Sequence, residues 1–176
     1  MSLAVSKLPK VETDPDSPSP GVTALAGAAC GLTLYRVMPH APLWWRDCAA
    51  LMARQLQRDM LSDVELFDAA STADLYEAWL FVKPFRDGRV VCGACCFRWR
   101  TWNDMPDGWS MQWAWLHPDF RREGCMSAAW TVFLRRYAPF MVERPISKAM
   151  HGFLAKRLGE GFEVKGEPVI VERSKT

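Results

Sequence analysis

The hydrophobic pattern changes its period within residues 109–138, and this change constrains the fold more than any other feature of the chain. From Trp109 to Trp115 a large apolar side chain stands at every second position, which is the period of a strand with one buried face. From Met126 to Tyr137 apolar side chains recur at intervals of three and four, which is the period of an amphipathic helix. A proline follows shortly after each run and ends it. We therefore predict a strand, a tight turn and a helix that begins directly after the turn.

The turn between these two elements, residues 121–126, has the features of an anion-binding site. Gly124 permits the sharp bend, and the residues that follow it begin the helix. The first N–H groups of a helix lack partners within the helix, and together with the helix dipole they favour an anion such as a phosphate. We interpret the turn as a candidate phosphate-binding site.

Residues 116–124, Leu-His-Pro-Asp-Phe-Arg-Arg-Glu-Gly, resemble the strand-to-helix motif of the GNAT acetyltransferases. In that motif an Arg or Gln, two residues, a Gly, one residue, and a Gly or Ala surround the pyrophosphate of acetyl-CoA. Arg121 and Gly124 match the motif, whereas Met126 stands where the family has Gly or Ala. The resemblance implies acetyl-CoA as co-substrate. The residues that it places at the cofactor are Trp115, Leu116, Arg121, Arg122, Glu123, Gly124, Cys125, Met126, Ser127 and Ser147.

The chain is expected to divide into a tail and one domain. Residues 1–31 include a proline- and serine-rich run that disfavours helix and sheet, so we predict a flexible tail or a strap along the surface. Residues 32–176 are predicted to form a single GNAT-like domain of mixed α/β fold, with a twisted, mostly antiparallel sheet of six to seven strands and about four helices. The expected strands are 32–38, 75–82, 90–102, 109–116, 140–143 and 164–172, and the expected helices are 44–61, 63–71, 125–138 and 146–158.

The resemblance implies that an amine attacks the thioester, which requires a neutral amine, a polarised carbonyl and a protonated leaving thiolate. Backbone N–H groups near Trp115 and Leu116 would polarise the carbonyl. Glu143 is the nearest carboxylate in sequence to act as base, and His151 and Tyr137 are candidate acids. A solvent-exposed surface carboxylate is the competing interpretation for Glu143, and a structural histidine is the competing interpretation for His151. The tyrosine that the family often carries near the end of the helix expected at 146–158 is missing.

The net charge and the cysteine pattern bear on the expected partners, compartment and metal content of the protein. The net charge is +2, which gives no general reason to expect nucleic acid or a membrane surface as a partner. The six cysteines favour reduced thiols in a cytoplasmic protein, and Cys92, Cys95 and Cys96 have no second ligand pair, so we expect no metal site. Residues 97–102 alternate aromatic and basic side chains, which suits either a sheet with one core face or a single-stranded nucleic acid surface.

We therefore expect a cytoplasmic, acetyl-CoA-dependent N-acetyltransferase that acts on a primary amine of a small molecule or a protein. A catalytically inactive GNAT-fold module that binds CoA or regulates a partner is the alternative. The sequence leaves the acceptor and the oligomeric state open, a homodimer included.

Overall fold

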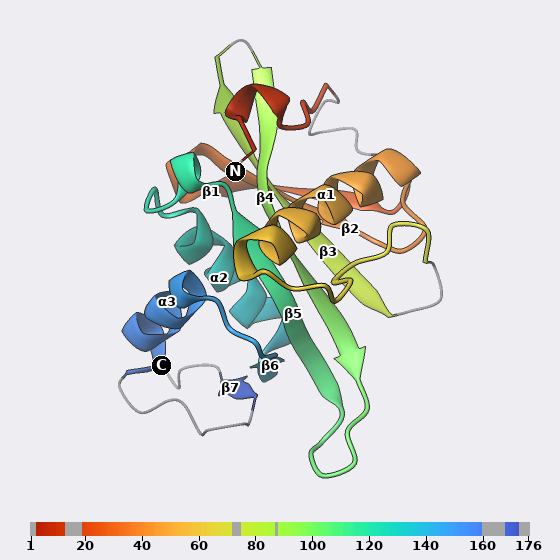
Figure 1. Ribbon diagram of the computed structural model, residues 1–176, viewed down its shortest axis with the longest axis vertical. Coiled ribbons are helices and arrows are strands. Elements are labelled where there is room, and N and C mark those ends of the chain that lie inside the picture. Colours follow the sequence, from red (N-terminus) through yellow and green to blue (C-terminus); the bar gives the residue numbers. More distant parts are fainter. Residues whose placement is uncertain (1–2, 13–18, 72–74, 87, 160–167, 173–176) are drawn as a thin grey trace.

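The computed structural model describes residues 3–12, 19–71, 75–86, 88–159 and 168–172. These residues form a mixed α/β fold around one seven-stranded open sheet, with the strands side by side in chain order (Figure 1). The strands are β1 (Val22–Ala28), β2 (Leu32–Val37), β3 (Tyr76–Phe85), β4 (Gly88–Arg100), β5 (Gly108–Leu116), β6 (Phe140–Val142) and β7 (Val169–Val171). The helices are α1 (Leu43–Met60), α2 (Cys125–Tyr137) and α3 (Lys148–Leu158), with short 3-10 turns at Val5–Lys7, Ala29–Gly31 and Pro118–Phe120.

The sheet is antiparallel at every junction except the one between β5 and β6, which is parallel. The crossover that joins these two parallel strands is α2, as the change of hydrophobic period predicts. The predicted GNAT-like fold class is thereby confirmed. Three α-helices, rather than about four, occur in the described part of the chain.

Helices cover both faces of the sheet, and this explains the long apolar runs in the central strands. Figure 1 shows α1 across one face and α2 behind the other. Phe133 of α2 packs edge-on against Trp79 of β3 and Phe97 of β4, at ring-centroid distances of 5.6 Å and 5.0 Å. Because helices cover both faces of the sheet here, β3 and β4 are buried along most of their length and show little polar alternation.

Strand β5 continues past the end of its parallel neighbour. It pairs with β6 only over Trp109–Met111, whereas residues 112–116 run on along β4. The register also shifts here, because Met111 lies opposite Phe97 and Trp113 lies opposite Cys96, so Gln112 is an extra bulge residue. β5 and β6 therefore separate at the end of β5 that leads into the predicted phosphate-binding turn.

The predicted boundary at residue 32 is wrong, because the sheet already includes residues of the expected tail. Val22–Ala28 forms β1, which pairs antiparallel with β2. Leu8 and Val11 are buried, and the Val11 N–H donates to Arg89 O at 2.9 Å. These apolar side chains pack against the core, which offsets the entropy cost of ordering the segment. The proline-rich run at 13–18 lies outside the described residues.

Residues 63–71 do not form the predicted helix. Helix α1 ends at Met60, its C-cap residue Leu61 has a left-handed φ of 52°, and an irregular loop follows. The Gln57 side chain donates to Val64 O, and the Asp68 carboxylate accepts from the Ala70 N–H at 2.8 Å. Such bonds from side chain to backbone compete with helical hydrogen bonds, so the loop is favoured despite its apolar spacing.

Candidate functional site

A short turn leads from the end of β5 into α2. His117 holds it in two ways: its ring Nδ1 accepts from the Asp119 N–H at 3.2 Å, and its backbone N–H donates to Cys92 O at 2.8 Å. Gly124 is exposed and stands directly before α2 with a φ of 82°. A left-handed φ suits glycine, and the N–H groups of the helical turn that follows lack intrahelical acceptors. The geometry of the predicted anion-binding turn is therefore present.

Arg121 is anchored to the base of this turn. Its Nε donates to Leu116 O at 2.8 Å, and its Nη2 lies 3.4 Å from Asp59 Oδ2 at the end of α1. The same Asp59 oxygen accepts from Trp115 Nε1 at 2.8 Å. Arg121 is exposed, so its guanidinium is held close to the turn and stays accessible to a solute anion. Asp59 thus fixes the position of a charge that the motif requires.

Arg122 and Glu123 are the other charged residues of the turn, and Glu123 is balanced by an ion pair. Arg122 is exposed and has a φ of 66°. Glu123 forms an ion pair with Lys83 of β3, and the hydrogen bond that Lys83 donates to Glu123 raises the pKa of the Lys83 ammonium group. Because Lys83 neutralises Glu123, that carboxylate repels an anion at Gly124 less than a lone carboxylate would.

The first turn of α2 places three predicted cofactor residues at different depths. Cys125 is buried, whereas Met126 and Ser127 are half-buried. Met126 packs against the hydrophobic core, where the family motif expects Gly or Ala. The Met126 side chain is therefore directed partly into the core. The backbone N–H of Met126 remains a potential hydrogen-bond donor.

Past Met111, the edge of β5 that faces away from β4 pairs with no strand among the described residues, and we call this stretch the opening between β5 and β6. The His117 N–H is bonded to Cys92 of β4, and hydrogen-bonding direction alternates along a strand. Ala114 and Leu116 therefore direct their backbone groups to the opposite edge, beyond the end of β6. Leu116 O accepts from Arg121, which leaves the Leu116 N–H as a donor at this opening.

A pocket of about 270 Å³ lies beneath the loop that follows α1. Gln112, the bulge residue of β5, forms part of its wall. The other lining residues include the carboxylates Glu65 and Asp68, the aromatic rings of Phe67 and Tyr76, and Arg98. The irregular loop 62–71 thus takes part in a polar pocket that reaches the point where β5 and β6 part.

Glu143 and Ser147 already have structural partners. The Glu143 carboxylate accepts from Arg100 Nε and Nη2 at 2.9 Å and 3.0 Å. Burial alone would raise the pKa of Glu143, but the hydrogen bonds and charge of Arg100 hold it below its usual value. A carboxylate held ionised in this way is a weak base. Ser147 is the N-cap of α3, where its Oγ accepts from the Met150 N–H at 3.2 Å.

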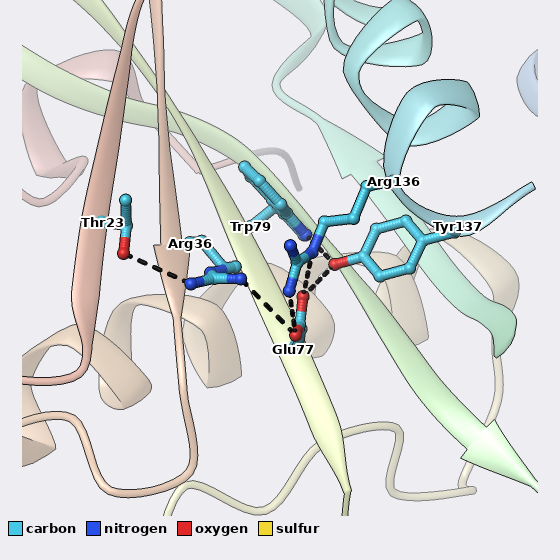
Figure 2. Close-up of polar contacts among 6 residues, drawn as sticks. All are labelled: Thr23, Arg36, Glu77, Trp79, Arg136 and Tyr137. Atoms are coloured by element: carbon cyan, nitrogen blue, oxygen red, sulfur yellow. Dashed lines mark hydrogen bonds and ion pairs between the residues drawn. The ribbon is translucent and has the colours of Figure 1, made fainter.

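The structure argues against Tyr137 as a catalytic acid. Its ring is buried, and the hydroxyl donates to Glu77 of β3 while it accepts from Trp79 Nε1 at 2.7 Å (Figure 2). Burial and the nearby Glu77 carboxylate raise the pKa of Tyr137. His151, by contrast, is exposed on α3. Of the three candidates for proton transfer, His151 alone keeps an exposed side chain.

Glu77 is the centre of a buried polar cluster. Arg136 of α2 contacts its carboxylate through Nε at 2.8 Å and Nη2 at 2.6 Å, and Arg36 of β2 lies 3.8 Å away (Figure 2). Burial alone would raise the pKa of Glu77, but the hydrogen bonds from Arg136 and Tyr137 outweigh it, so the pKa is lowered. The cluster fastens the C-terminal turn of α2 to the sheet, while the N-terminal turn carries Gly124.

Comparisons with known proteins do not identify a family for this chain. The structure is similar to that of an integron cassette protein from the mobile metagenome of V. cholerae, VCH_CASS6, with a TM-score of 0.46 and 13% sequence identity over 82% of this chain and 94% of that chain. No protein-family model matches the sequence, and no curated protein matches it significantly. The functional argument therefore rests on the residues of the site.

Two structural features are absent from the described residues. None of their helices has the length and apolar character needed to cross a bilayer. They also contain no group of three or more His, Cys, Asp or Glu side chains arranged to hold a metal ion.

Proposed function

We propose that the protein is an acetyl-CoA-dependent N-acetyltransferase that transfers the acetyl group to a primary amine of a small molecule or a protein. The observation that carries this proposal is the exposed Gly124 turn before α2. The turn follows β5, which extends beyond the end of its parallel partner β6. A diphosphate fits the unpaired N–H groups of α2 and the anchored Arg121. In this proposal the extended arm of the coenzyme lies along the part of β5 beyond Met111 that β6 does not pair with.

The chemistry follows from the same arrangement. The Leu116 N–H is directed to the open edge of β5, where it can donate to the thioester carbonyl and stabilise the negative charge that develops on its oxygen. The amine attacks the carbonyl carbon, the C–S bond breaks, and CoA leaves as a thiol after it gains a proton. The chain thus supplies position and polarisation, which are the main requirements for a reactive thioester.

The acceptor belongs in the pocket beneath loop 62–71. Glu65 and Asp68 give this pocket two carboxylates, which attract a protonated amine. Gln112 links the pocket to the opening at the bulge of β5. A basic amine that enters here loses a proton to solvent before it attacks, because only the neutral form is a nucleophile.

A second function is favoured by one observation. Glu143 is held by Arg100, and Tyr137 is buried in the Glu77 cluster, so two of the three candidate proton-transfer residues are engaged in structural contacts. A module that binds CoA without turnover fits this arrangement.

Calorimetry and a product assay separate the two functions. We expect the full-length protein to bind both acetyl-CoA and CoA, and we expect CoA and acetylated amine to appear by chromatography when a panel of primary amines is supplied. Binding without any product above the hydrolysis background would support the non-catalytic module. Absence of binding at millimolar acetyl-CoA would contradict both proposals.

A further inference from the structure

Two cysteine thiols that are far apart in the sequence meet beside the Gly124 turn. The Sγ atoms of Cys30 and Cys125 lie 3.8 Å apart, and the Cys30 thiol donates to the sulfur of Cys125. Cys30 lies in the 3-10 turn between β1 and β2, and Cys125 is the first residue of α2. The fold therefore brings the edge hairpin and the start of the crossover helix into contact through sulfur.

The two thiols differ in exposure, which suits a pair in which one reacts with a solute and the other resolves the product. All six cysteines lie in the described part of the chain, and Cys30 alone among them is exposed. Cys30 also has a φ of 68°, a left-handed conformation that is uncommon for a residue with a side chain. The backbone thus holds Cys30 in an unusual conformation at the place where it meets Cys125.

We propose that Cys30 and Cys125 form a disulfide when the protein meets a peroxide. The Cys30 thiolate attacks one oxygen of hydrogen peroxide, the O–O bond breaks, and the leaving hydroxide takes up a proton to give water and a sulfenic acid on Cys30. The Cys125 thiolate attacks the Cys30 sulfur, the S–O bond breaks, and a second water leaves. Two thiols are oxidised, one peroxide is reduced, and the sulfur atoms close to the usual bond length of about 2.05 Å.

The surroundings of Cys125 set the pH dependence of the second step. Burial and the neighbouring Cys30 raise the pKa of Cys125 to about 11. The Lys83 ammonium group opposes this shift, whereas Glu123 adds to it, and Cys92 is the other thiol that senses Cys125. Because the thiolate is the nucleophile, closure of the disulfide should speed up by about tenfold per pH unit in the neutral range.

The test counts thiols in the full-length protein. After reduction and desalting, we expect six thiols before treatment with hydrogen peroxide and four after it, with a mass loss of two hydrogen atoms and a peptide linkage between Cys30 and Cys125. The Cys30→Ser variant should keep its five thiols. The Cys92→Ser variant should fall from five to three, because Cys92 is buried and bonded to Phe81 O rather than paired with Cys125.

Four results would overturn the proposal. They are retention of all six thiols, a linkage that contains Cys92, a covalent dimer joined through Cys30, and stepwise oxygen addition to Cys30 without a linkage. None of these readouts depends on acetyl-CoA, so the disulfide can stand or fall separately from the proposed enzyme activity.

Discussion

Replacement of Tyr137 by Phe removes one hydroxyl and keeps the ring. The ring stacks on Phe97 at a centroid distance of 4.0 Å, and that contact should survive. The hydroxyl donates to the Glu77 carboxylate and accepts from Trp79 Nε1. The change therefore removes a bond to a charged group, worth about 1.5 to 3 kcal/mol, and leaves the buried indole N–H without its acceptor. We expect Tyr137→Phe to lower the free energy of unfolding by about 2 to 4 kcal/mol.

The chain offers a matched control. Tyr35 is also fully buried, but among the described residues its hydroxyl has no hydrogen-bond partner. Tyr35→Phe removes the same atom without breaking a bond, so the free energy of unfolding should change by less than about 1 kcal/mol or increase. Urea unfolding at pH 7 measures both variants. With a slope of about 2 kcal/mol per molar, the midpoint for Tyr137→Phe should fall by about 1 to 2 M.

Acidification gives a second readout of the same cluster. The folded-state pKa of Glu77 lies below its ordinary value, so the stability that its ionised form provides is complete above the unfolded pKa of about 4.3 and is lost as pH falls through the folded pKa. The difference between the wild type and Tyr137→Phe should therefore be constant near neutrality and shrink below about pH 4. Equal losses in Tyr137→Phe and Tyr35→Phe at pH 7, or a difference that does not depend on pH, would refute this account of the cluster.

Three further substitutions test other parts of the structure. Gly93→Ala should destabilise the protein by about 2 to 3 kcal/mol in urea unfolding, because a Cβ there would lie 2.6 Å from Trp115 O and force β5 away from β4. Gly152→Ala should stabilise it by about 1 kcal/mol in the same assay, because this helical position has open space around the added methyl group. Glu143→Gln should lower the rate of amine acetylation by less than tenfold, since Arg100 holds the carboxylate ionised; a loss of a hundredfold or more would identify it as the base.

The parts of the fold that the sequence predicts are those in which one hydrophobic period dominates. The strand over Trp109–Trp115 and the helix from Cys125 to Tyr137 are confirmed as elements. The apolar residues of the strand do not share one face, however, because the bulge at Gln112 places Trp109 against Tyr137 of α2 and Trp115 against Asp59 of α1. Residues 22–28 were missed as a strand, because small residues carry little periodic signal and their pairing depends on β2, which follows in the chain. Local spacing predicted a helix at 63–71, but side-chain bonds such as that of Asp68 favour a loop.

The candidate site divides in the same way. Gly124 and Arg121 are recognisable because a local motif sets their geometry. Asp59 of α1 and Lys83 of β3 contact the turn. They could not be predicted, because a local sequence pattern does not indicate partners that are distant in the chain. Glu77 did leave a signal, since it is a single charged residue inside an apolar strand, and such a residue needs a buried partner.

The most direct test of the central claim is a calorimetric titration of acetyl-CoA into the wild type and the Gly124→Val variant, with Gly152→Ala as the control. A β-branched side chain disfavours the φ of 82° at Gly124, so the turn should lose its shape. We expect one acetyl-CoA per chain for the wild type and the control, and an affinity at least tenfold lower for Gly124→Val. No binding to the wild type at millimolar acetyl-CoA, or equal affinities for all three proteins, would contradict the claim.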